Sequence, residues 1–244
     1  MAQMGRQISV LKPLYVVEHW QLAEADAGRQ HLIDCGFDLR LVEPWRGDKL
    51  PVLTGEEAGV MVMGGPQMIT EASSEKHSYL LEELSFIEEA MDKSVPLVGV
   101  CLGSQMIAQV LGAKVGFHPR DEIAMGFYPL NATPHGQELG LSDGMMVLDG
   151  NAQGWEAPHA ATMLATSPDE NPWPNQAFSI GKTLALQFHP EVTRKILDQW
   201  QTDFASSIGR SGTQSKRAMD EGFKAYDAVL KAWYKGALED WFTV

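Results

Sequence analysis

The sequence is poor in cysteine: of its 244 residues, only Cys35 and Cys101 carry a thiol, and they form no CxxC pair. Two such residues give no disulfide framework, which fits a reducing compartment. No stretch approaches the roughly 18 consecutive apolar residues that cross a bilayer. Residues 1–17 also lack the apolar core and cleavage site of a signal peptide. We therefore expect a cytoplasmic protein that is neither secreted nor inserted in a membrane.

Basic residues are also scarce, with 19 Lys and Arg against 32 Asp and Glu and a formal net charge of −13. This charge repels phosphate backbones and anionic lipid surfaces, so neither nucleic acid nor a membrane is an expected partner. Several histidines are scattered without HExxH or another ligand spacing: His31, His77, His118, His135 and His159. We expect neither a metal nor an organic cofactor.

Short β-type runs alternate with helical patterns in the first half of the chain. The runs lie at 14–17, 38–42, 59–63 and 96–100. Amphipathic helices are predicted over 78–92 and from Leu102 to Gly112. After Gly116, shorter runs separated by Gly, Pro and Asn predict further, partly antiparallel strands. The pattern predicts an α/β fold with a mostly parallel central sheet flanked by helices.

A polar joint at 206–217 precedes a last predicted helix. Its apolar residues recur at helical spacing: Met219, Phe223, Tyr226, Leu230 and Trp233. The length and a hydrophobic content of 44% suit a catalytic domain over 1–205 and a C-terminal helical extension over 206–244. We expect the apolar face of this helix to pack on its own domain, and a homodimer contact is the alternative.

The stretch VGVCLGSQ at 98–105 places a cysteine between a predicted strand and a predicted helix. Gly99 and Gly103 flank Cys101 in the pattern GxCxG, which resembles a nucleophile elbow. The glycines fit a sharp turn in which neighbouring backbones come too close for side chains. At a helix N-terminus, the macrodipole and free N–H groups favour a thiolate. A small buried residue in a tight turn is the alternative explanation of Cys101.

Two later motifs add chemistry to this cysteine. In LALQFHPEV at 184–192, a strand is predicted to continue into His189-Pro190-Glu191. Because residues two apart on an extended strand face the same side, Glu191 is placed to orient His189, which can exchange a proton with the thiol. In VMVMGGPQ at 60–67, the N–H of Gly65 and that of Leu102 are candidate oxyanion donors. Each motif alone also fits an ordinary loop, but together they favour a catalytic site.

With these motifs in this order, the sequence resembles the class I glutamine amidotransferases, the Cys-His-Glu family that includes the glutaminase part of GMP synthase and stand-alone members similar to it. The resemblance runs from about Leu14 to Trp200 over MGGPQ, PLVGVCLGSQMIAQVLGAKV, EIAMGF, NQAF and QFHPE. It implies the flavodoxin-like architecture of that family. It also implies site roles: Cys101 as nucleophile, His189 as general base and acid, Glu191 as its orienting partner, Gly65 and Leu102 as oxyanion donors, and Gln105 as a contact to glutamine.

The implied reaction is hydrolysis of a γ-carboxamide through a γ-glutamyl thioester on Cys101, with release of ammonia and no cofactor. In relatives, a His-Gly-Asp-like stretch before the catalytic histidine helps to hold the amino-acid end of the substrate. Asn151-Ala152-Gln153 stands in that place here, so the resemblance implies that Asn151 lies in the substrate wall, for glutamine or another γ-glutamyl compound. The chain shows no ATP-pyrophosphatase signature, so we expect it to deliver the ammonia to a separate synthetase subunit. A stand-alone γ-glutamyl peptidase or amidase, and a catalytically weak binding module of the same fold, are the alternatives.

Overall fold

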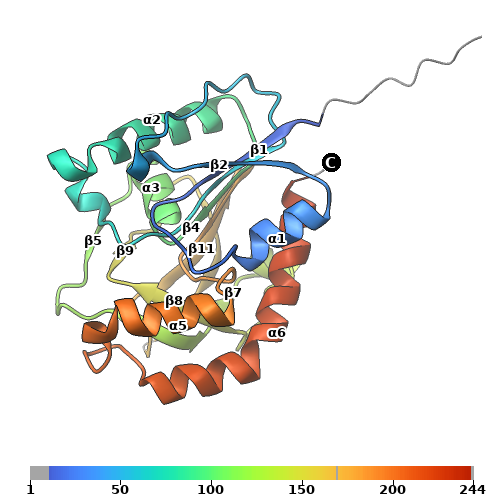
Figure 1. The fold of residues 1–244 in the computed structure, drawn as a ribbon. Helices are drawn as coiled ribbons and strands as arrows, with labels where there is room; N and C mark the ends of the chain where they lie inside the picture. The colour runs from blue at the N-terminus through green and yellow to red at the C-terminus, as the bar shows by residue number, and fades with distance from the viewer. Residues whose placement is uncertain (1–10, 169, 243–244) are drawn as a thin grey trace, which may run out of the picture.

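An eight-stranded sheet forms the centre of the computed structural model, which describes residues 11–168 and 170–242 (Figure 1). The first ten residues of the expected 1–205 domain and the last two of the extension lie outside the described residues. The strand order is β2-β1-β3-β4-β12-β11-β10-β7. The bounds are β1 Pro13–Val17, β2 Asp38–Val42, β3 Gly59–Val62, β4 Leu97–Val100, β7 Asn131–Ala132, β10 Thr162–Thr166, β11 Asn175–Ile180 and β12 Thr183–Leu186.

The first five strands of that order are parallel, and β11, β10 and β7 continue the sheet in antiparallel pairs. The order of the parallel part, with β12 as its fifth strand, is that of a flavodoxin-like fold. All four predicted N-terminal strands form within one residue of their expected ends. The predicted α/β class and its mostly parallel sheet are confirmed.

Helices cover both faces of the sheet (Figure 1). They are α1 Ala27–Asp34, α2 Tyr79–Asp92, α3 Leu102–Val110, α4 Pro134–Glu138, α5 Arg194–Asp203 and α6 Lys216–Trp241, with short 3₁₀ turns η1 Pro44–Arg46, η2 Ile69–Glu71, η3 Glu75–His77 and η4 Ala205–Ser207. Alternating side chains of β3 separate the two cores: Met61 packs with residues of α1 and α6, and Val62 with residues of α2 and α3.

Two smaller antiparallel pairs extend the fold beyond the main sheet. They are β5 Val115–Phe117 with β9 Gln153–Trp155, and β6 Ala124–Pro129 with β8 Met146–Asn151. The C-terminal helix α6 contacts α1, β6 and β8 and buries Met219, Leu230 and Tyr234. Tyr226, which the spacing placed on the same apolar face, is instead 39% exposed.

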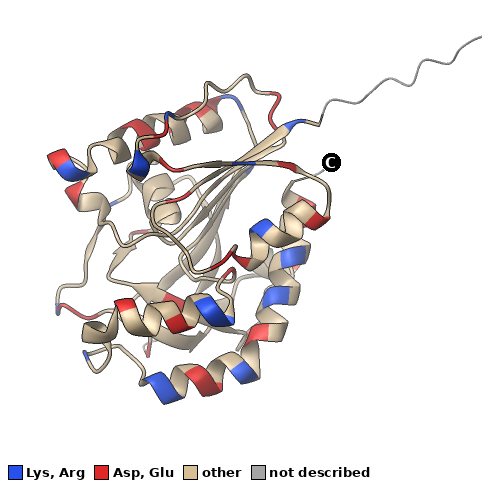
Figure 2. Ribbon diagram, viewed as in Figure 1, with Lys and Arg blue, Asp and Glu red and all other residues tan. Residues whose placement is uncertain are grey.

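Charged residues lie mainly on the helices and loops, and the central strands are almost free of them (Figure 2). This distribution leaves the sheet interior to apolar packing and moves the polar groups to its edges. None of the helices that the structure describes is long and apolar enough to span a membrane.

Candidate active site

Cys101 occupies the junction between β4 and α3 in a conformation that non-glycine residues rarely adopt, with φ 50° and ψ −107°. Such a backbone costs of order 1–3 kcal/mol. A Cβ on Gly103 would lie 2.0 Å from the carbonyl oxygen of Val62, and one on Gly99 would lie 2.7 Å from the carbonyl carbon of Gly103. The predicted steric reason for both glycines is confirmed, and the turn holds the cysteine at the carboxyl edge of the sheet.

His189 and Glu191 meet as predicted, with His189 Nδ1 2.7 Å from Glu191 Oε1 and both side chains buried. The reason given from the sequence was wrong, because β12 ends at Leu186 and the pair lies in the turn that follows. The N–H of His189 donates to the carbonyl of Leu148 on β8, and the carbonyl of Glu191 accepts from the N–H of Ala27. Contacts to two other elements therefore fix the pair, not an extended strand.

Gly64 brings the histidine and the cysteine together. A Cβ at Gly64 would lie 2.9 Å from Cε1 of His189 and 3.3 Å from Cβ of Cys101, so both side chains lie against this one residue. Burial lowers the pKa of His189, but the charges of Glu191 and Cys101 outweigh it and raise the pKa to about 10. The imidazole thus holds its proton at neutral pH in this geometry, which favours an imidazolium beside the sulfur.

A second acidic group, not identified from the sequence, lies behind the cysteine. In its protonated form the Cys101 thiol donates to Asn151 Oδ1 at 3.2 Å, and Asn151 Nδ2 donates to Asp149 Oδ1 at 3.2 Å. Asn171 Nδ2 donates to the other oxygen of Asp149. Asp149 is fully buried, and this burial raises its pKa to about 7 against the opposing effects of Asn171 and His189. Its signal in the sequence is an Asp two residues before Asn151 on the same face of one strand.

The remaining predicted residues surround the same cysteine. Gly65 and Gln105 line a cavity next to Cys101, and Gln105 Nε2 donates to the carbonyl of Gln153 at 2.8 Å. Leu102 is the first residue of α3, so its N–H has no partner within the helix. Its side chain packs in the core instead of lining the cavity. Asn151, expected only in the substrate wall, also contacts the thiol itself.

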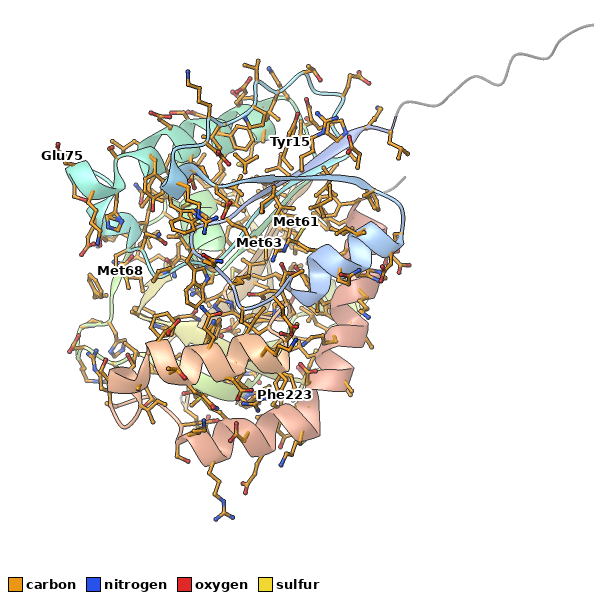
Figure 3. All side chains as sticks on the ribbon, in the orientation of Figure 1. Tyr15, Met61, Met63, Met68, Glu75 and Phe223 are labelled. Atoms are coloured by element: carbon orange, nitrogen blue, oxygen red, sulfur yellow. The ribbon has the colours of Figure 1, made fainter. Side chains whose placement is uncertain are left out.

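The cavity encloses about 160 Å³ at the carboxyl ends of β3 and β4. Met63, which directly follows β3, and Met68, which precedes η2, both line it and are labelled in Figure 3. Part of the wall is apolar, which the sequence did not predict, and is formed by Trp20, Leu22, Ile196, Trp200 and Phe204. The signal was available for two of these residues, since Ile196 and Trp200 are four positions apart on α5.

One other group of ligand-type side chains lies outside the cavity in the part of the chain that the structure describes. His31, Cys35 and Glu239 come within 4.8 Å of one another where α1 meets α6. His31 Nε2 lies 2.7 Å from Glu239 Oε1. The His31-Cys35 spacing of one helical turn was visible in the sequence, but the contribution of Glu239 depends on the tertiary contact.

A cysteine on a nucleophile elbow, a buried His-Glu pair and a cavity at the carboxyl edge of a flavodoxin-like sheet define an α/β enzyme of the cysteine-nucleophile amidotransferase class. The chain belongs to the family described as "Glutamine amidotransferase class-I", whose family model matches residues 29–201. This confirms the resemblance seen in the motifs.

Curated relatives agree with that membership, and a solved structure shares the fold. The chain is 30% identical to the GMP synthase [glutamine-hydrolyzing] of Bdellovibrio bacteriovorus over 138 residues, 55% of this chain and 24% of that protein. It is 31% identical over 125 residues to the glutamine amidotransferase-like protein YfeJ of Salmonella typhimurium, 50% of this chain and 51% of that protein. The matches thus span a quarter to a half of these relatives. A glutamine amidotransferase from Thermotoga maritima has the same fold, with a TM-score of 0.83 at 24% identity over 96% of this chain and 99% of that one.

Proposed function

We propose that the chain hydrolyses the side-chain amide of glutamine through a γ-glutamyl thioester on Cys101 and that a separate synthetase subunit accepts the ammonia. The observation that carries this proposal is the packing of Cys101 and His189 against Gly64 at the wall of one cavity, with Glu191 on the far side of the imidazole. The relatives named as glutamine-hydrolysing GMP synthases support the choice of glutamine.

The reaction needs a nucleophile, a proton carrier and donors for the oxyanion. The Cys101 sulfur attacks the amide carbon, and the N–H groups of Gly65 and Leu102 stabilise the negative oxygen that develops. His189 passes its proton from Nε2 to the departing nitrogen, because Nδ1 is held by Glu191. A water molecule that gives its proton to His189 then cleaves the thioester and releases glutamate.

The part of the cavity that is lined by amide side chains suits the glutamyl part of the substrate. Gln105, Asn151 and Gln153 line it with polar side chains, and each makes a hydrogen bond that fixes its position. In the proposal these residues hold the amino-acid end of the substrate while Cys101 reacts at the other end. The reducing cytoplasm is the compartment that we propose, since the mechanism needs a free thiol.

The test is glutamate and ammonia release from glutamine by the purified chain, with Cys101→Ala as the control. The proposal is supported if the wild type alone releases both products in equal amounts. A γ-glutamyl adduct on Cys101 in acid-quenched samples supports the thioester. Glutamine hydrolysis at the same rate by the Cys101→Ala variant would refute it. Slow turnover that a co-purifying protein accelerates supports the acceptor subunit, and full turnover by the chain alone would overturn that part while leaving the hydrolysis intact.

A further inference from the structure

The cavity has two chemically different sides. Polar amide side chains border the cysteine, as described above, whereas the opposite part is apolar. Trp200 and Ile196 are buried members of one hydrophobic cluster, and Trp20, Leu22 and Phe204 pack on it while partly exposed. We call these five residues the aromatic wall.

The aromatic wall adjoins the histidine. The ring of Trp200 lies edge-on to the ring of His189, with centroids 4.6 Å apart. Trp20 and Phe204 extend the wall as a ring pair with centroids 5.5 Å apart. The apolar surface therefore begins at the residue that donates the proton to the leaving nitrogen.

This placement decides which part of a substrate meets the wall. His189 must approach the departing nitrogen, so any substituent on that nitrogen lies on the histidine side of the cavity. The amide nitrogen of glutamine carries no substituent and would leave this surface unused. Apart from Cys101 and the His189-Glu191 pair, no ionisable side chain lines the cavity in the described ranges, so a charged substituent finds no partner.

We propose that the site also hydrolyses N-substituted γ-glutamyl amides whose leaving amine carries an apolar, preferably aromatic, group. The inference rests on the thioester chemistry proposed above. The Cys101 sulfur bonds to the amide carbon, the C–N bond breaks with its electron pair on nitrogen, and that nitrogen takes the proton of His189 and leaves as the amine. A water molecule then gives a proton to His189 and its oxygen bonds to the thioester carbon; the C–S bond breaks with its electron pair on sulfur, which yields glutamate and restores the thiolate beside the protonated imidazole.

Two amides with leaving amines of similar basicity provide the test: γ-glutamyl benzylamide and γ-glutamyl 2-methoxyethylamide. We expect kcat/KM to be at least about tenfold higher for the benzylamide, because burial of its ring against the wall is gained only on that substrate. Phe204→Ala should move this ratio towards one. The matched control is Phe117→Ala, which removes a 53% exposed aromatic ring outside the cavity and should leave the ratio as in the wild type.

A binding measurement separates failure of the subsite from failure of the chemistry. Calorimetry with the Cys101→Ala variant reports the affinity of both amides without turnover, and we expect at least about tenfold tighter binding of the benzylamide. Equal affinities would overturn the aromatic subsite even if glutamine is hydrolysed. Tighter benzylamide binding with no hydrolysis of any amide by the wild type would instead refute the proposed function and the hydrolytic part of this inference, leaving a binding site only.

Discussion

Asp149→Asn is the substitution that tests most directly what the buried second carboxylate does. Burial raises the pKa of Asp149 from 3.8 to about 7, so the folded protein keeps a proton that the unfolded chain releases. Rising pH between these two values therefore favours unfolding. The gap of about 3 pH units, at 1.36 kcal/mol each, amounts to about 4 kcal/mol, of which about 3 kcal/mol falls above pH 5.

The assay is urea unfolding of the wild type and Asp149→Asn at about pH 5 and about pH 9. We expect the free energy of unfolding to fall less with pH in the variant, by about 3 kcal/mol, because asparagine does not ionise. Burial also raises the pKa of Glu18 to about 7, so Glu18 lowers the free energy of unfolding as the pH rises in both proteins. Glu18→Gln is the matched control, because it removes that contribution and keeps the one from Asp149. An identical pH dependence in wild type and Asp149→Asn would refute the reasoning.

The same substitution should also lower activity, although Asp149 does not touch the substrate in the proposed mechanism. Asparagine offers one acceptor oxygen to the amide groups of Asn151 and Asn171, which now bind two carboxylate oxygens. One donor then loses its partner, at about 1–3 kcal/mol, and Asn151 is no longer held against the thiol. We expect kcat/KM to fall about tenfold or more. If ionisation of Asp149 produces a step near pH 7 in the pH profile of the wild type, that step should be absent from the variant. Unchanged kinetics would show that Asn151 holds its position without this carboxylate.

The other predictions concern the elbow and the triad. Cys101→Ala and Cys101→Ser should abolish amide hydrolysis with the fold intact by circular dichroism, and Cys101→Gly should be about 1 kcal/mol more stable than Cys101→Ala because glycine accepts φ 50° without strain. His189→Ala should be as damaging to kcat as loss of the cysteine and Glu191→Gln milder; a more damaged glutamate variant would reverse the roles assigned here. Gly103→Ala should destabilise the protein by about 3 kcal/mol or more in urea unfolding, while Gly116→Ala, which has open space around it, should not.

The main architecture could be predicted from the sequence because the parallel strands are short apolar runs with clear boundaries. Strands β3 and β4 are buried along their whole length, and β1 and the half-exposed β2 pair within the sheet, so tertiary contacts reinforce the local pattern. Helix α5 was missed because its apolar residues are few: Ile196, Leu197 and Trp200 are buried among seven mainly polar neighbours. Its N-cap Thr193, which accepts from the N–H of Ile196, was the overlooked local signal.

The site was predictable to the extent that its residues lie in short motifs. The elbow depends on contacts within a few residues and one neighbouring strand, and its glycines mark those contacts directly. The aromatic wall joins Trp20 after β1 to Trp200 on α5 and Phe204 at its end, about three quarters of the chain length away. No local pattern encodes such a contact, because it depends on the turn after β12 and the placement of α5 over the cavity.

Two buried carboxylates near His189, those of Glu191 and Asp149, lie at the edge of the sheet and outside the apolar cores on its two faces. Glu191 binds the imidazole directly, whereas Asp149 acts through Asn151 on the sulfur, so each partner of the proton transfer has its own support. Burying both acids disfavours folding, and the strained Cys101 adds to that cost. The apolar cores on the two faces of the sheet lie apart from these groups and supply the stability that offsets them. Asp149→Asn should therefore lose less stability than the wild type as the pH rises and should also weaken the chemistry, a pairing that a purely structural role for Asp149 would not produce.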